Sequence, residues 1–355
     1  MSNFSYKRLR RRGLAASIFP LLIGLLLVAC DRSPPDLSVR LTGSTMGTNY
    51  ELKLVPAPGQ TIPTDLQTRI EALLAGINRQ MSTYDPNSEL SRFNQNPSTD
   101  WVSTSPELAQ VVAEGLRISA LSGGVFDITV GPLVNLWGFG PDPHHDEIPS
   151  ETAIAQARER VGAGRLHVRA EPPALKKDRP NLYLDLSSLA KGYGVDRMAA
   201  LIDSIPIENY LVSISGEIRV RGHNGRGEPW TIAVEKPVAG QRAVERLIRL
   251  DNRAVSTSGD YRNFFERNGR RYSHIINPRT GWPILQELAS VTVISDRSMV
   301  ADATATALMA AGPQLGLQLA SEHHLAALFI LIKADGSFQE QFTPELESHL
   351  LPEQP

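Results

Sequence analysis

The sequence predicts an α+β fold, in which mixed or antiparallel sheets pack against helices within a single domain. Short β-rich runs dominate the chain after residue 181, and helical patterns interrupt them without the regular alternation of a doubly wound sheet. No stretch within residues 39–345 has the composition of a linker between two domains. A chain of 355 residues is long enough to bury a sizeable core.

The first 29 residues have the pattern of a signal peptide. Five basic residues within Lys7–Arg12 precede an apolar run from Gly13 to Ala29. Pro20 interrupts this run, which is shorter than a comfortable membrane-spanning helix. We therefore expect residues 1–29 to be removed during export, with an uncleaved membrane anchor as the alternative.

Cys30, the only cysteine of the chain, directly follows that run. Leu27-Val28-Ala29-Cys30 resembles the bacterial lipobox, in which the cysteine becomes the lipidated first residue of the mature chain. The absence of a second cysteine that could form a disulfide favours lipidation. Asp31 resembles the retention signal of inner-membrane lipoproteins. We expect residues 30–38 to be a lipidated cysteine and tether that hold the protein on the periplasmic side of the inner membrane.

The charge of the remaining chain argues against nucleic-acid binding. The five basic residues of the signal peptide reduce the 36 Lys and Arg of the whole chain to 31, against 38 Asp and Glu, a net charge of about −7. Binding to a phosphate backbone needs clustered basic residues. We therefore expect no nucleic-acid partner.

The first part of the mature chain contains an expected hairpin and two expected helices. Val39–Leu54 alternates between apolar and polar residues and is interrupted at Gly43–Gly47, which predicts two strands. Apolar residues at helical spacing predict a helix over Asp65–Gln80. Ser105-Pro106 is a typical helix start, and this second helix ends at Ser122-Gly123-Gly124.

Residues 141–180 are rich in proline and charge, and we expect them to be an insertion that contains one helix, Glu151–Val161. His144-His145-Asp146 is interpreted as a solvated loop, because no second cluster of metal ligands accompanies it. Further helices are expected at Leu189–Ser204 and Ala301–Ala311, and residues 346–355 are expected to be a tail. The expected strands are Tyr183–Leu186, Tyr210–Ile214, Ile218–Arg221, Trp230–Val234, Leu247–Leu250, Leu288–Ile294 and a final hairpin from Ala326–Lys333 through Asp335-Gly336.

Two segments contain residues suited to binding phosphates and a cation. Asp185–Asp196 runs from an expected strand into a helix start, where free N–H groups favour an anion and Lys191 adds a positive charge. An exposed helix lysine explains Lys191 equally well. Asp302 and Thr306 share one helical face and supply the hard oxygen ligands that suit Mg2+. The alternative is an aspartate at a helix start and a threonine bonded to its own backbone.

Two further segments are candidate parts of a site. His274 lies between a β-like run and a Pro/Gly turn, so its imidazole is a candidate acceptor for a hydroxyl proton, although a structural histidine is more common. The glycines of Ser122–Phe139 permit close backbone approach to a ligand. The aromatic residues of that segment suit either a ligand site or a core.

Together these segments resemble the ApbE family of FAD:protein FMN transferases. The matching segments occur in the family's order, and they are Gly43–Thr48, Met81–Asp85, Gly123–Asp127, Asp185–Asp196, Ser256–Tyr261, His274–Gly281 and Ala301–Thr306. The resemblance covers about residues 40–312. It implies the family's single α+β domain, related to the T-fold, with FAD in a cleft, and we place this domain at residues 39–345.

The resemblance also implies roles for single residues. Mg2+ would be held against the pyrophosphate by Asp302, Thr306 and the Ser188 carbonyl. The residues that would line the FAD site or contact the nucleotide are Met46, Tyr84, Val125, Phe126, Asp127, Asp185, Lys191, Ile275 and Ile276. Two departures from the family pattern are Asn277, where an aspartate is common, and Ser215-Gly216-Glu217, which replaces Gly-Gly-Asp.

The reaction that the resemblance implies is Mg2+-dependent transfer of FMN from FAD to a Thr or Ser hydroxyl of an acceptor protein, with release of AMP. Lys191 and the cation would neutralise charge, and His274 is the candidate base. The implied acceptors are subunits of membrane redox complexes such as the Na+-translocating NADH:quinone oxidoreductase or Rnf. Two alternatives stay open: a Mg2+-dependent FAD pyrophosphatase that produces FMN and AMP, and a non-enzymatic flavin-binding lipoprotein.

Overall fold

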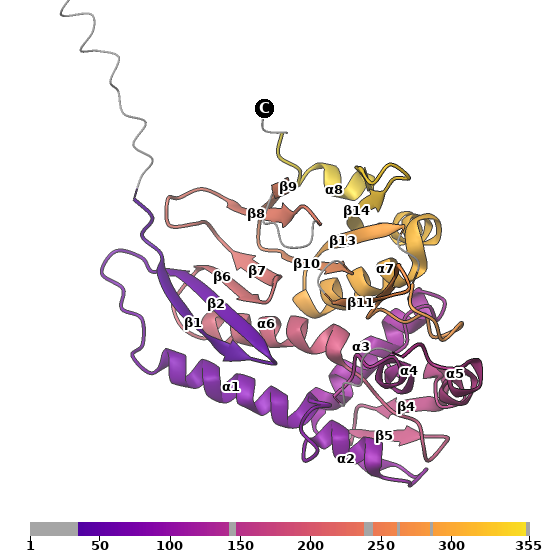
Figure 1. Ribbon diagram of the computed structural model, residues 1–355. Helices are drawn as coiled ribbons and strands as arrows, with labels where there is room; N and C mark the ends of the chain where they lie inside the picture. The colour runs from indigo at the N-terminus through magenta and orange to yellow at the C-terminus, as the bar shows by residue number, and fades with distance from the viewer. Residues whose placement is uncertain (1–34, 142–146, 238–243, 261–262, 285–286, 353–355) are drawn as a thin grey trace, which may run out of the picture. The chain divides into compact units, whose positions relative to one another are not determined.

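An antiparallel sheet of eight strands forms the centre of the fold (Figure 1). The computed structural model describes residues 35–141, 147–237, 244–260, 263–284 and 287–352, and Asp36–Pro355 form one compact unit. Every neighbouring pair in the sheet is antiparallel. The strand order is β1 (Val39–Thr45), β2 (Thr48–Val55), β6 (Asn209–Ile214), β7 (Glu217–Arg221), β10 (Ala254–Gly259), β13 (Leu288–Ser295), β14 (Ala326–Ile332) and β15 (Phe338–Phe342).

Smaller sheets and helices surround the main sheet. The smaller sheets are β3 (Val102–Ser103) with β5 (Ala174–Lys177) and β4 (Leu166–Arg169), β8 (Trp230–Glu235) with β9 (Val244–Leu250), and β11 (Phe264–Arg267) with β12 (Arg270–Ser273). The helices are α1 (Leu66–Met81), α2 (Glu89–Gln95), α3 (Pro106–Leu121), α4 (Gly131–Leu136), α5 (Glu151–Arg158), α6 (Ser187–Asp203), α7 (Ser298–Glu322) and α8 (Pro344–Glu347). The α+β class predicted from the sequence is confirmed.

The two faces of the main sheet have different environments near β2 and β6. Leu52 and Val212 are register partners, and both are buried in a core cluster that includes residues of α1 and α6. The neighbouring register pair, Glu51 and Ser213, points to the opposite face because side chains alternate along a strand. At these two residues the opposite face lines a cleft, and further along the same strands it is covered by a second core cluster that contains Val55 and Leu211. Near Glu51 and Ser213 the register therefore places a core on one side of the sheet and the cleft on the other.

Most predicted elements of the first half are confirmed within one or two residues. β1 and β2 form the expected hairpin, and their turn is made by Met46 and Gly47, both in the left-handed region at φ of 50° and 70°. Ser105 caps α3 as predicted, since its side chain accepts a hydrogen bond from the Leu108 N–H at 3.3 Å.

The prediction of a strand at Tyr183–Leu186 is wrong. This segment is not a strand and pairs with none of the strands in the described parts of the chain. The Asn94 side chain takes the place of a partner strand, because its Oδ1 accepts from Leu184 N–H at 2.8 Å and its Nδ2 donates to Leu184 O at 2.9 Å. The Asp185 N–H bonds to Ile128 O at 2.8 Å. An apolar run with β propensity is therefore held by a side chain, which no local pattern indicates.

Helix α7 and strand β10 also differ from prediction. Helix α7 continues beyond Ala311 to Glu322, across a kink at Gly312 whose φ of 79° is non-helical. Strand β10 was not predicted, because its Ser/Thr-rich sequence lacks an apolar alternation. It nevertheless lies in the middle of the main sheet, between β7 and β13.

The segment 141–180 contributes to the core of the unit. Helix α5 confirms the expected helix, and Leu166 of β4 and Leu175 of β5 are buried in the same core cluster as α1 and α6. The chain also stays packed after residue 345, since Leu346 is fully buried. His144-His145-Asp146 lies outside the described residues, as do the signal sequence, Cys30 and Asp31. Among the helices that are described, none is long and apolar enough to cross a membrane.

Candidate functional site

A cleft of about 1380 Å3 lies over the polar face of the main sheet. Its walls come from β1, β2, the segment after α3, the start of α6, the β6–β7 turn, β10 and α7. Almost all site residues predicted within the described chain line it. They are Tyr84, Val125, Phe126, Asp127, Asp185, Ser188, Lys191, His274, Ile275, Ile276, Asp302 and Thr306.

Met46 is the exception among the described candidates. It is not one of the residues that line the cleft. Its side chain lies against α6, where a Cβ added at Gly194 would come 3.3 Å from Met46 Cε. Met46 also packs against the core cluster of α1 and α6. In this structure its side chain therefore supports the helix that carries Lys191.

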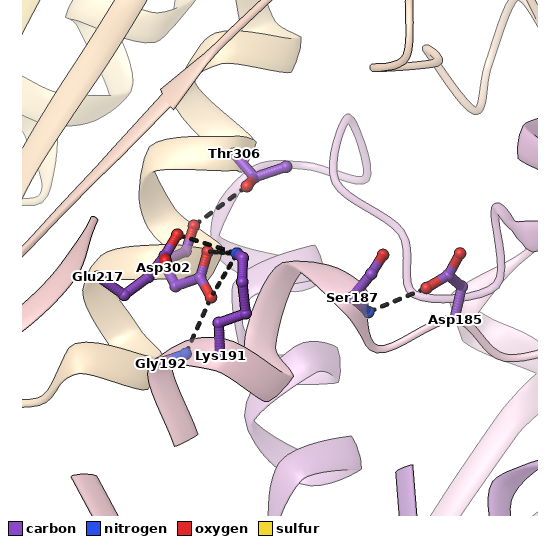
Figure 2. Close-up of polar contacts among 7 residues, drawn as sticks. All are labelled: Asp185, Ser187, Lys191, Gly192, Glu217, Asp302 and Thr306. Carbon is purple, nitrogen blue, oxygen red and sulfur yellow. Dashed lines mark hydrogen bonds and ion pairs between the residues drawn. The ribbon is translucent and has the colours of Figure 1, made fainter. Parts of the chain in front are cut away.

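A charged cluster formed by Lys191, Glu217 and Asp302 lies in the wall of the cleft (Figure 2). Lys191 Nζ is 2.9 Å from Glu217 Oε1 and 3.5 Å from each carboxylate oxygen of Asp302. Both acids are 5% exposed. Two carboxylates thus share one ammonium group, and the cluster carries an excess negative charge when all three groups are ionised.

The environment of the cluster raises the pKa values of both Lys191 and Asp302, but for different reasons. Burial lowers the pKa of Lys191, but the adjacent charges of Asp302 and Glu217 exceed this effect and raise it overall. Burial raises the pKa of Asp302 to about 7, although the charge of Lys191 acts to lower it. Lys191 therefore stays protonated at neutral pH. The positive charge near Asp302 does not offset the effect of burial on its carboxylate.

Glu217 was not predicted as a site residue. It belongs to Ser215-Gly216-Glu217, which replaces the Gly-Gly-Asp of the family pattern, so its contacts could not be predicted from the sequence. The structure places it opposite Lys191, and its second oxygen, Oε2, is buried with no hydrogen-bond partner. An unpartnered buried carboxylate oxygen is costly and indicates space for a positive group. No local sequence pattern indicated this role, because Glu217 and Lys191 meet only in the folded chain.

The groups around Asp302 fit a Mg2+ ion. The Thr306 hydroxyl donates to Asp302 O at 3.1 Å, which leaves the lone pairs of Thr306 Oγ1 available to a cation. The backbone bond expected as the alternative reading of Thr306 is therefore present and is compatible with a ligand role. No three His, Cys, Asp or Glu side chains of the described chain form a metal cluster. Mg2+ suits such a site, because it takes few protein ligands and completes its shell with water and phosphate.

The carbonyl of Ser188 is the third expected ligand. In a regular α-helix this carbonyl accepts from the N–H four residues later, which belongs to Gly192. That N–H donates to Asp302 Oδ2 at 3.1 Å. Asp302 therefore accepts a hydrogen bond from the N–H that a regular helix would direct to Ser188. The carbonyl oxygen of Ser188 has two lone pairs and can bind another partner.

The glycines of α6 are explained by packing. A Cβ at Gly192 would lie 2.5 Å from Ser298 O and 2.7 Å from Met299 N, so only glycine lets α6 touch the start of α7. At Gly194 a Cβ would lie 2.9 Å from Ile214 Cδ1. The Gly-x-Gly pattern thus brings Lys191 and Asp302 together by close helix contact.

His274 has the geometry of a proton acceptor. Its Nδ1 is 3.0 Å from Asn263 O, and because a carbonyl only accepts, Nδ1 carries the proton and Nε2 has the free lone pair. Burial lowers the pKa of His274, and the charge of Lys191 adds to this effect. Phe139 packs edge-on against the ring with centroids 6.3 Å apart. The imidazole is therefore neutral and oriented at neutral pH.

Two predicted FAD-site carboxylates also shape the backbone. Asp127 Oδ1 accepts from the N–H and hydroxyl of Thr129, both at 2.7 Å, and its Oδ2 accepts from Ala163 N–H at 2.9 Å. Asp185 Oδ1 accepts from Ser187 N–H at 2.9 Å and so caps the start of α6 (Figure 2). Asp127 therefore ties the cleft wall to the 141–180 segment, and Asp185 orients the helix that carries Lys191.

Comparisons with known proteins agree with the resemblance found in the sequence. FAD:protein FMN transferase of Vibrio cholerae serotype O1 is 46% identical over 316 residues, covering 89% of this chain and 93% of that protein. FAD:protein FMN transferase of Haemophilus influenzae is 42% identical over 331 residues, covering 92% and 94%.

Solved structures show the same relationship. Flavin transferase ApbE from Vibrio cholerae superposes with a TM-score of 0.83 at 44% identity, covering 89% of this chain and all of that one. The apo form of Pseudomonas stutzeri flavinyl transferase ApbE superposes with a TM-score of 0.80 at 39% identity, covering 88% and 97%. The model of the ApbE family matches residues 46–329. The chain belongs to the ApbE family.

Proposed function

We propose that this protein transfers FMN from FAD to a Thr or Ser hydroxyl of acceptor proteins and releases AMP. The observation that carries the proposal is the Lys191–Glu217–Asp302 cluster, which shares one large cleft with the neutral imidazole of His274. The relatives named FAD:protein FMN transferase support the choice of substrate.

In the proposed reaction, the acceptor hydroxyl oxygen forms a bond to the FMN phosphorus, and the bond from that phosphorus to the AMP oxygen breaks. The hydroxyl proton passes to His274 Nε2, and AMP leaves with the electron pair of the broken bond. Such transfers require mainly orientation of the reactants and neutralisation of charge. The oriented imidazole of His274 and the fixed ammonium of Lys191 support such a transfer.

Asp302, Thr306 and the Ser188 carbonyl are the residues that would hold Mg2+. When bound, Mg2+ supplies positive charge that stabilises the pyrophosphate and the leaving phosphate. Lys191 contributes a second positive charge, since Asp302 and Glu217 keep it protonated. Glu217 holds the ammonium at 2.9 Å and thereby fixes its position in the wall of the cleft.

The remaining cleft residues would bind the organic parts of FAD. Tyr84 is 67% exposed, which leaves its ring face free to stack on an aromatic ligand. Phe126 and Ile276 are mostly buried and present apolar surface at the cleft wall. These residues would position the dinucleotide so that its pyrophosphate lies near the charged cluster.

The cellular setting is part of the proposal. Lipidation at Cys30 and retention through Asp31 would anchor the enzyme on the periplasmic side of the inner membrane. Subunits of membrane redox complexes of the NADH:quinone oxidoreductase or Rnf type are the proposed acceptors, because their exposed hydroxyl groups would lie at the same membrane surface.

An assay of flavin partitioning tests the proposal. The protein is incubated with FAD and Mg2+, with and without a purified acceptor subunit, and the products are separated under denaturing conditions. We expect flavin fluorescence to remain on the acceptor and AMP to appear in equal amount. Free FMN with an unmodified acceptor would instead indicate the pyrophosphatase, and intact FAD would indicate a flavin-binding protein.

A further inference from the structure

We infer that Asp196 is a positioning residue for the proposed cation site, because it caps helix α7 from the neighbouring helix α6 and fixes where Asp302 stands. The inference rests on the proposed function in one respect, namely that Asp302 ligates the cation. Asp196 does not line the cleft and contacts no substrate-binding residue directly. Its effect on the site would be transmitted through helix α7.

The start of α7 has no cap from its own sequence. Arg297 occupies the N-cap position and makes no side-chain cap hydrogen bond. Asp196 instead supplies both acceptors, since Oδ1 accepts from Ser298 N–H at 2.9 Å and Oδ2 from Met299 N–H at 3.0 Å. These N–H groups would otherwise lack intrahelical partners, and a carboxylate is favoured at this end of the helix dipole.

A second contact joins the same two helices, with the donor now on α6 and the acceptor on α7. Gly192 N–H of α6 donates to Asp302 Oδ2 of α7 at 3.1 Å. Gly192 and Asp196 are four residues apart on α6, and Ser298 and Asp302 are four residues apart on α7, so each pair shares a helical face. Two hydrogen-bonded contacts one turn apart prevent the helices from sliding along each other. These contacts thereby fix the position of Asp302 along the axis of α7, next to Lys191.

Asp196 also joins this helix pair to the main sheet. Arg219 Nη1 of β7 donates to Asp196 Oδ1 at 2.8 Å, and both side chains are partly buried. The three elements that meet at Asp196 each carry one member of the charged cluster: α6 carries Lys191, α7 carries Asp302 and β7 begins with Glu217. One carboxylate thus fixes the relative positions of all three charged groups without touching them.

The chain provides a matched control at Asp203, which lies on the same helix. Asp203 Oδ1 accepts a hydrogen bond from Nη1 of Arg221, a residue of β7, at 2.8 Å, and another from the Tyr210 hydroxyl at 2.8 Å. It makes no contact with α7 and does not line the cleft. Replacing Asp203 therefore removes a similar ion pair between α6 and β7 while the α7 cap stays intact.

The experiment measures Mn2+ affinity with FAD present, using the electron paramagnetic resonance signal of free Mn2+ as the readout. Mn2+ accepts the same oxygen ligands as Mg2+. We expect Asp196→Asn to weaken Mn2+ binding about tenfold or more, as removal of outer-shell partners of metal ligands typically does. Asp203→Asn should change it by less than about twofold, which matches a local surface ion pair. Thermal melting of both variants reports their stability separately.

Two further variants make the result decisive. Asp302→Ala should abolish this Mn2+ binding, and if it binds as the wild type does, the proposed cation site is wrong whatever Asp196 does. Arg219→Met keeps the cap bonds and removes only the ion pair, so a smaller loss than in Asp196→Asn is expected. This variant also serves if Asp196→Asn fails to fold. Wild-type Mn2+ affinity in both Asp196→Asn and Arg219→Met, with binding lost in Asp302→Ala, would overturn the inference.

Discussion

The ammonium of Lys191 lies closer to Glu217, at 2.9 Å, than to Asp302, at 3.5 Å. This asymmetry means that Lys191 is held mainly by a carboxylate of the β6–β7 turn, while Asp302 is only loosely paired. A loosely paired, buried carboxylate gains most from a second cation. This geometry supports the proposed roles, which are charge neutralisation for the lysine and metal binding for Asp302.

Removal of the Asp302 carboxylate should abolish transfer. In Asp302→Ala the cation loses its only expected carboxylate ligand, so the rate of flavin transfer should fall on the order of a hundredfold or more. The α7 backbone and its cap remain, so the circular dichroism spectrum should match that of the wild type. A variant that flavinylates at the wild-type rate would refute the metal assignment.

Neutralising Glu217 should raise the Mg2+ requirement. Glu217→Gln leaves Lys191 with Asp302 as its remaining ionic partner, and the ammonium then competes with the cation for that carboxylate. We expect the Mg2+ concentration for half-maximal transfer to rise roughly tenfold, with the rate at saturating Mg2+ much less affected. An unchanged Mg2+ dependence would show that Glu217 does not control the pairing of Lys191.

Replacement of His274 should separate catalysis from binding. His274→Gln removes the proton acceptor but keeps a polar side chain of similar reach, so transfer should slow by roughly 10²–10⁴-fold. The affinity for FAD, measured by fluorescence titration, should change little. Loss of FAD binding in this variant would make His274 a pocket residue instead.

The pH dependence of transfer should report the lowered pKa of His274. A base acts in its neutral form, so activity is lost as pH falls through the pKa of His274. Because burial lowers this pKa below its usual value of about 6.5, the acidic limb of the rate profile should have its midpoint below pH 6.5. The profile is measured at saturating FAD and Mg2+, because bound Mg2+ keeps the carboxylate of Asp302 ionised and leaves His274 as the group that titrates. A midpoint above pH 6.5 would contradict the assignment.

Helix contact at Gly192 should be sensitive to one methyl group. In Gly192→Ala the new Cβ meets the Ser298 and Met299 backbone, so α6 and α7 must separate at a cost of about 1–3 kcal/mol or more. Gly76→Ala in α1 is the control, since only the Arg79 guanidinium lies within reach, at 3.8 Å. It should stabilise the protein by about 0.5–1 kcal/mol. Equal effects in chemical denaturation would show that the helices do not touch at Gly192.

Local patterns in the sequence predicted the elements that have local causes. The Ser105 cap follows from the preference of a single residue and is confirmed. The interruption expected over Gly43–Gly47 is a turn at Met46 and Gly47 only, since the first strand continues through Thr45. The segment around Leu184 was predicted as a strand from its β-like sequence. The prediction failed because the side chain of Asn94, distant in sequence, takes the place of a partner strand. The Ser/Thr-rich strand β10 is set by its position between two strands and not by its own sequence.

The sequence alone left structural alternatives open for Asp302, Thr306 and Lys191, and the resemblance to the ApbE family selected a cation site and a phosphate contact. All three residues line the cleft. Glu217 and Asp196 were not identified, because their roles depend on which elements meet in space. A carboxylate that holds a lysine or caps a distant helix looks like any surface acid in the sequence.

The most direct test of the central claim is the position of a divalent cation in crystals grown with FAD and Mn2+. Anomalous scattering locates Mn2+ independently of the refined atoms. We predict a peak about 2.0–2.2 Å from an Asp302 carboxylate oxygen and from Thr306 Oγ1, next to the pyrophosphate of FAD. A Mn2+ peak elsewhere in the cleft, with Asp302 still paired to Lys191, would contradict it.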